Sequence, residues 1–137
     1  MANPNIAAVT SIYGSTAYIT PAVTTAAQTN WVYATGTSAT TAITGLTPAS
    51  GSVQRVTSIV ATNVSAAACA ATVSIHSATA GAAIAYPLAY AISVPANSSL
   101  IVVDKTSAFY LTEAQSISVS TGVASSLVFV ATIETIT

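Results

Sequence analysis

The sequence predicts an all-β protein, an antiparallel β-sandwich of eight or nine strands for which a jelly roll is one arrangement. Val, Ile and Thr contribute 49 of the 137 residues, whereas Leu contributes five, and β-branched residues favour strands. Lys, Arg, Asp and Glu together make up only 4% of the chain, so the charged residues that are common in surface helices are nearly absent. Short alternating segments recur between turn residues, a pattern that is typical of a sandwich.

The N-terminal part contains three expected strands, at residues 5–13, 18–23 and 31–33. Gly14 is expected to end the first strand, and Pro21 interrupts the second. Pro4 and Pro21 favour an extended path for the chain. Residues 1–25 are therefore expected to form an extended arm, either packed on its own domain or exchanged with a neighbour. Residues 35–52 are rich in Thr, Ser, Gly and Ala, which predicts a long loop.

The rest of the chain contains six more regular segments, at residues 53–63, 71–77, 90–94, 100–103, 116–120 and 127–134. Segment 53–63 carries Val or Ile on both faces, which predicts a central strand covered on both sides. The alternation in 71–77 and 116–120 places the apolar residues inward, and the serines and His76 outward. The apolar residues of segment 90–94 are expected to share one face.

Length and charge limit the classes of function. A chain of 137 residues is typical of one domain, here residues 1–137. With only two basic residues, the chain cannot displace the counterions of a nucleic acid, so no nucleic-acid partner is expected. The most apolar stretch, 82–92, is shorter than the ~20 residues of a membrane-spanning helix, so no membrane partner is expected. The net charge of −1 and the mean hydropathy of +0.72 favour self-association or a permanent protein partner.

The residues that could carry catalysis or bind a metal are few. His76 is the only histidine, and no nucleophile or set of metal ligands accompanies it in the sequence. The three acidic residues are Asp104, Glu113 and Glu134. Their spacing fits neither a calcium loop nor a glycosidase pair, and Asp104 is expected in a local turn or a surface pair with Lys105. Cys69 lies among alanines and is interpreted as a buried or loop thiol. The sequence therefore predicts no enzyme and no cofactor or metal.

The candidate interface residues are Tyr13, Tyr18, Trp31, Tyr33 and Arg55. The four aromatic residues cluster in the first quarter of the chain, and aromatic residues are enriched at protein interfaces. We interpret them as interface or core anchors, with carbohydrate binding as the less favoured alternative, because no polar cluster beside them would orient a sugar. Arg55 can pair with an acidic residue of its own subunit or reach a neighbouring one, and both alternatives stay open.

Five segments resemble a known family when they are read together. They are NPNI (3–6), VTSIYG (9–14), SIVATNV (58–64), ISVPANSSL (92–100) and FYLTE (109–113). The chain resembles small virion structural proteins from tailed phages of cyanobacteria and other marine bacteria. The resemblance covers the N-terminus and most of the second half, whereas residues 34–52 have no counterpart. The chain also carries fewer charges and more alanine than that family, and Ala114 stands where a glycine is expected.

The resemblance implies a non-enzymatic virion component. The first expectation is a capsid decoration or cement protein on the capsid surface. It would form a homo-oligomer, expected to be a trimer, and would bind the major capsid protein. A tail, neck or fibre-associated protein of the virion is the close alternative. The aromatic cluster supports a different class of function, a module that binds the host surface.

Overall fold

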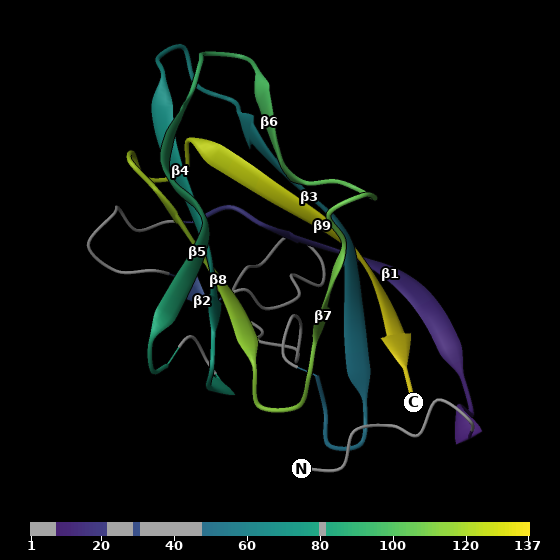
Figure 1. Cartoon of the computed structure of the whole chain (residues 1–137). Helices are drawn as coiled ribbons and strands as arrows, with labels where there is room; N and C mark the ends of the chain where they lie inside the picture. Colours follow the sequence, from purple (N-terminus) through teal and green to yellow (C-terminus); the bar gives the residue numbers. More distant parts are fainter. Residues whose placement is uncertain (1–7, 22–28, 31–47, 80–81) are drawn as a thin grey trace.

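The computed structural model describes residues 8–21, 29–30, 48–79 and 82–137 (Figure 1). The strands in these residues are β1 (Ile12–Ile19), β2 (Thr29–Asn30), β3 (Val53–Asn63), β4 (Cys69–His76), β5 (Ala85–Val94), β6 (Ser99–Val103), β7 (Phe109–Leu111), β8 (Ser116–Thr121) and β9 (Leu127–Ile136). No α-helix occurs in this part of the chain. The predicted all-β antiparallel sandwich of eight or nine strands is confirmed, and nine strands are described.

The strands form two antiparallel sheets that pack as two layers (Figure 1). Sheet A has the order β1-β9-β3-β6, and β7 pairs with β3 beside β6. Sheet B has the order β2-β8-β4-β5. The edge strand β5 of sheet B contacts the edge strand β6 of sheet A, so these two edges lie on the same side of the sandwich.

The core lies between the sheets and consists mainly of small side chains. Its largest fully buried side chains are Phe129, Ile59, Leu111, Ile117, Leu127 and Ile133. Val and Ala supply most of the remainder. Because few bulky residues fill this core, each of them accounts for a large share of the apolar burial that stabilises the fold.

Strand β3 is central, as predicted, but it is not covered on both sides. Its burial alternates, with buried residues facing the core and half-buried residues on the other face. The register with β9 shifts between Val56 and Ser58, which leaves Thr57 as an extra residue. This bulge exchanges the two faces of the strand, so Val56 and Ile59 both reach the core. The periodicity of an uninterrupted strand would have placed them on opposite faces.

The N-terminal strands differ from the prediction. Residues 12–19 form one edge strand, β1, which passes through Gly14 and pairs with β9 along its whole length. Gly14 therefore does not end a strand, and the expected break before Tyr18 is absent. Of the expected arm 1–25, the structure describes residues 8–21. The expected strand 31–33 and most of the expected loop 35–52 lie outside the described residues.

The outward-facing polar residues of β4 and β8 are buried, which corrects the prediction that they face solvent. Opposite one another in the register lie Thr72 and Ser120, Ser74 and Ser118, and His76 and Ser116. All six side chains are buried, and His76 is only 4% exposed. Sheet B therefore has burial on both faces along β4 and β8, although hydroxyl groups in a strand pattern usually indicate a solvent-facing side.

Strand β5 is also irregular. Its register with β4 shifts twice, and β5 contributes the extra residues at Leu88 and at Tyr90–Ala91. Ala91 has a φ of 49°, and its N–H donates to Thr72 Oγ1 at 2.9 Å. The bulge at Tyr90–Ala91 separates Tyr90, which is exposed, from Ile92 and Val94, which pair in unbroken register with Ala71 and Cys69. The alternation had predicted one face for all three apolar residues, but only Ile92 and Val94 share a face, and the bulge takes Tyr90 off it.

Candidate interaction surfaces

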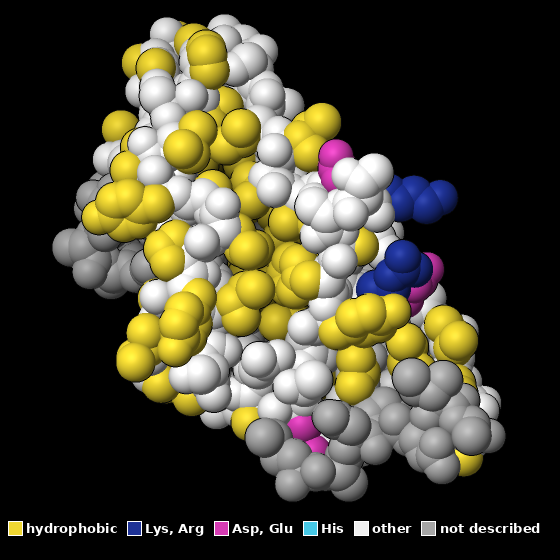
Figure 2. All heavy atoms as spheres, viewed as in Figure 1, with side chains coloured by type: hydrophobic (Ala, Val, Ile, Leu, Met, Phe, Trp, Pro, Cys, Tyr) yellow, Lys and Arg dark blue, Asp and Glu magenta, His cyan; other side chains and the backbone are white. Residues whose placement is uncertain are grey.

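The most apolar exposed surface follows β5. Ile84 and the β5 residues Tyr86, Leu88, Tyr90 and Ile92 are all exposed, and Tyr90 reaches 72%. Figure 2 shows hydrophobic side chains over β5 and in the band between β5 and β7, whereas the basic side chains project on the other side of this view. With ~150–250 Å² for a large side chain, these five expose on the order of 500 Å². This summed exposed area is comparable to that of the largest apolar patches on monomeric proteins, and such patches often bind a partner.

The backbone of β5 is poorly suited to pairing with a further strand. Pro87 has no N–H to donate, and the two bulges interrupt the free edge. Natural proteins use both devices to prevent edge-to-edge pairing. A partner on this surface would therefore be held by side-chain contacts rather than by extension of the sheet.

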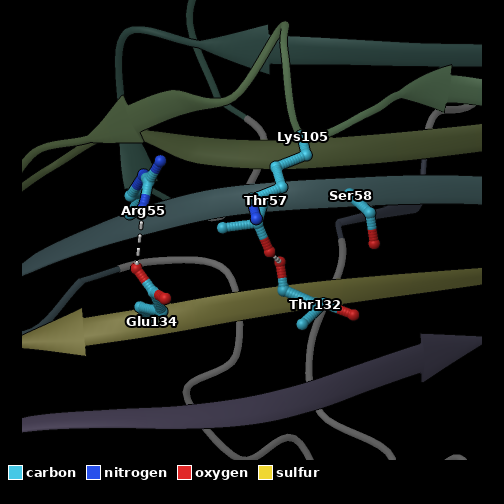
Figure 3. A pocket seen from close by; sticks show the side chains of 6 residues that line it. All are labelled: Arg55, Thr57, Ser58, Lys105, Thr132 and Glu134. Atoms are coloured by element: carbon cyan, nitrogen blue, oxygen red, sulfur yellow. Dashed lines mark hydrogen bonds and ion pairs between the residues drawn. The ribbon is translucent and has the colours of Figure 1, made fainter.

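A second feature is a pocket of about 280 Å³ on the outer face of sheet A, shown in Figure 3. It is lined by Arg55, Thr57, Ser58, Lys105, Thr132 and Glu134. The side chains come from β3, from β9 and from the loop between β6 and β7. Arg55 and Lys105 are the only basic residues of the chain, and the fold brings both to this one pocket.

The charges in the pocket are only partly compensated. Arg55 Nη1 donates to Glu134 Oε2 at 3.2 Å, and both side chains are partly exposed. An ion pair of this kind contributes at most about 1 kcal/mol to stability. Within the described part of the chain, Lys105 has no ion pair. Two positive charges and one negative charge give the pocket a net charge of +1, and its hydroxyl groups add further polar contacts.

A tight turn holds Lys105 over the pocket. Asp104 Oδ1 accepts hydrogen bonds from Thr106 N at 2.9 Å, from Thr106 Oγ1 at 2.7 Å, and from Ser107 N and Oγ at 2.9 and 3.0 Å. The Thr106 hydroxyl makes the largest contribution, followed by Ser107, and together they lower the pKa of Asp104 to about 2. Asp104 therefore forms the local turn that was one of its two predicted roles, and Lys105 is not its partner.

This turn predicts a pH dependence of stability. The pKa of Asp104 is about 2 in the folded chain and about 3.9 in an unfolded one. The stabilisation by its carboxylate is therefore present above about pH 4 and is lost as the pH falls toward 2. We expect Asp104→Asn to have a lower urea midpoint than the wild-type chain at pH 5, and the two midpoints to converge at pH 2. A difference of equal size at both pH values would contradict this role.

The predicted interface residues do not form one site. Trp31 and Tyr33 lie outside the described residues. Tyr13 and Tyr18 are 55% and 43% exposed, but they lie five positions apart on β1 and point to opposite faces. Arg55 lies on the outer face of sheet A and pairs with Glu134 of its own chain, which is one of the two alternatives left open for it. The described members of the set are thus spread over two faces.

His76 and Ser118 form a buried pair. His76 Nδ1 lies 3.1 Å from the Ala82 carbonyl oxygen, and Nε2 lies 2.6 Å from Ser118 Oγ. A carbonyl can only accept, so a neutral imidazole donates from Nδ1 and accepts the Ser118 hydroxyl at Nε2. A serine beside a histidine is the arrangement of an activated nucleophile, but Ser118 has no exposed surface. In this structure the two side chains satisfy each other's buried polar groups.

Cys69 is buried, which is one of the two interpretations that the sequence allowed for its thiol. Its Sγ lies 3.0 Å from Thr121 Oγ1 and accepts from Val123 N at 3.2 Å. No three metal-binding side chains gather anywhere in the described ranges. The described residues contain no helix that is long and apolar enough to span a bilayer.

Sequence reasoning missed both surfaces. The signal for β5 was the apolar stretch 82–92, which was considered as a membrane segment and, at residues 90–94, as a strand, but not as an interaction surface. No sequence signal joined Arg55 to Lys105, because Arg55 lies on a strand and Lys105 lies in a loop.

Comparisons of the chain with protein-family models, with curated proteins and with solved structures found no match.

Proposed function

We propose that this chain is a non-enzymatic structural component of a phage particle, a capsid decoration or cement protein that reinforces the head lattice. The observation that carries the proposal is the apolar surface on β5, which contains no charged residue. Burial of such a surface against another protein needs little desolvation of charge. The resemblance of the five sequence segments to small virion proteins points to the same class of function.

The fold is consistent with this role. If the short strand β7 is set aside, eight strands form the paths β1-β9-β3-β6 and β2-β8-β4-β5. This supports assigning the sandwich to the double-sheet jelly rolls, which are found in viral capsid domains and also in lectins. Because a fold alone does not determine function, the argument for assembly depends on the surface.

The occupant proposed for the apolar surface on β5 is an uncharged apolar face of the major capsid protein. A standard protein interface buries about 800 Å² on each partner. The five exposed side chains supply on the order of 500 Å² of this area, and the polar rim around them would supply the rest. Many copies on one lattice would hold the particle together even if each contact were weak.

The test of this proposal is the number of copies of the chain in purified virions, measured by quantitative mass spectrometry against the major capsid protein. A simple fraction of the capsid subunits is expected for a decoration protein. A much smaller count, as for a tail ring or a few fibres, would favour the tail, neck or fibre alternative. Absence from the particle would overturn the structural role.

A host-surface module is the second candidate, because five of the six tyrosines lie in the described residues and all five are exposed. Aromatic faces can stack on sugars, and jelly rolls also occur in lectins. If this candidate holds, single substitutions of Tyr13, Tyr18, Trp31 and Tyr33 should abolish adsorption to cells without affecting the stability of the particle. A loss of particle stability would place these residues in the assembly interface instead.

A further inference from the structure

Among the described residues, two side chains of opposite charge have neither an ion pair nor a side-chain hydrogen bond. The Asp104 carboxylate accepts hydrogen bonds from residues of its own turn, and Arg55 pairs with Glu134. Lys105 and Glu113 remain, and no ion pair joins either of them to any described residue. The chain has only five charged side chains, so one cation and one anion are without a partner among the described residues.

Glu113 lies in the turn between β7 and β8, and that turn closes without its carboxylate. Thr112 N donates to Gln115 Oε1 at 2.8 Å, and Gln115 N donates to the Thr112 carbonyl at 3.1 Å. Ala114, where the resemblance had led us to expect a glycine, has a φ of 68°. The turn thus has the left-handed geometry that favours glycine, and Gln115 supplies its side-chain contacts. Glu113 is partly exposed and is not a lining residue of the pocket of its own chain.

We infer that the pocket formed by Arg55, Lys105 and Glu134 receives Glu113 of a second copy of this chain. The inference rests on the self-association that the proposed function includes, and it names the contact that would produce it. The occupant follows from charge, because lining residues of net charge +1 match one carboxylate, and Glu113 is the acid that has neither a hydrogen bond nor an ion pair among the described residues.

The chemistry of the pocket suits a carboxylate side chain. Arg55 uses one terminal nitrogen on Glu134 and keeps other N–H donors, and Lys105 carries three donors. Figure 3 shows Arg55 and Lys105 on the same side of the pocket, above Glu134. The volume of about 280 Å³ is just below the ~300–1,000 Å³ of small-molecule sites, which is a size for one inserted side chain. A single net charge is too small for a nucleic acid.

The contact is heterologous, since the pocket and Glu113 belong to different parts of the surface. Contacts of this type build a ring if the rotation between copies closes, and a filament if it does not. A ring would agree with the trimer that the resemblance implies. The inter-copy ion pair would be partly exposed, so its strength should fall as salt shortens the range of the interaction.

The experiment measures self-association of the full purified chain by sedimentation equilibrium at about 50 and 500 mM salt, which span the range of strong and weak screening. Lys105→Gln and Glu113→Gln should each weaken association about two- to fivefold at low salt. The charge reversals Lys105→Glu and Glu113→Lys should weaken it further. The double variant Lys105→Glu/Glu113→Lys has the net charge of the wild-type chain and should restore it.

Val123→Glu is the matched control, because Val123 is exposed and this substitution changes the net charge by the same amount as Lys105→Gln. It should leave association unchanged. Circular dichroism checks that each variant is folded. A wild-type chain that stays monomeric, or a double variant no better than the single reversals, would overturn the inference. The count of copies in virions tests the proposed function separately, because a chain present in virions but monomeric when purified overturns only this pairing.

Discussion

Replacement of Phe129 by alanine is expected to lower the free energy of unfolding by about 3–5 kcal/mol. Phe129 is the largest fully buried side chain of the described core. In the register of sheet A it lies between Ile19 of β1 and Ala61 of β3. Because Ala61 cannot extend into the space that the ring leaves, much of the cavity would remain, and the cost should lie toward the upper end of this range. Urea unfolding, followed by circular dichroism, measures the change.

Phe109 provides the control, because it is the only other phenylalanine of the chain. It packs against the core but is only partly buried. Phe109→Ala should therefore cost clearly less than Phe129→Ala, since less apolar area is removed from the interior. Equal losses for the two variants, or a loss below about 1 kcal/mol for Phe129→Ala, would show that the core does not lie between the sheets as described.

The second large effect is expected at the apolar surface on β5. Tyr90→Lys should weaken binding of the chain to phage heads that lack it by about 30-fold or more, because a central aromatic anchor typically contributes 2 kcal/mol or more. Tyr90 is 72% exposed, so the same substitution should leave the urea midpoint unchanged. Co-sedimentation of the purified chain with heads, over a range of concentrations, measures the binding.

Tyr18→Lys is the matched control for this experiment. It adds the same charge at another exposed tyrosine, but on β1 at the outer face of sheet A. Binding to heads should be close to that of the wild-type chain. If Tyr18→Lys weakened binding and Tyr90→Lys did not, the lattice contact would lie on sheet A, and the role proposed for the apolar surface on β5 would be wrong.

The strands that the sequence predicted best are those whose signal is local. The predicted segment 53–63 has the same first and last residues as strand β3, and the predicted segment 116–120 lies within β8. In both, the alternation extends over enough residues to be read from neighbours alone. The errors arise at bulges. Thr57 in β3 and the extra residues of β5 exchange the faces of a strand, and such a shift depends on the partner strand rather than on the strand's own residues.

The burial of His76 also could not be predicted from local sequence, because it depends on a neighbouring strand. Its position among serines and threonines predicted an exposed residue, because hydroxyl groups usually mark the solvent face of a strand. In the fold, β4 and β8 are interior strands of sheet B, and His76 and Ser118 bond to each other. A hydrogen-bond partner is what permits a polar side chain to be buried, and for His76 and Ser118 that partner depends on the register between two strands.

By itself the sequence determined the class of fold, the near absence of charge and the apolar character of the segment that becomes β5. These properties follow from composition and from the two-residue period of a strand, which are local. Only the tertiary structure decided which side chains meet. Arg55 and Lys105 lie fifty positions apart, and they share one pocket because β3 and the β6–β7 loop meet at the outer face of sheet A. Pairing of this kind is set by strand order and register, which no short stretch of sequence specifies.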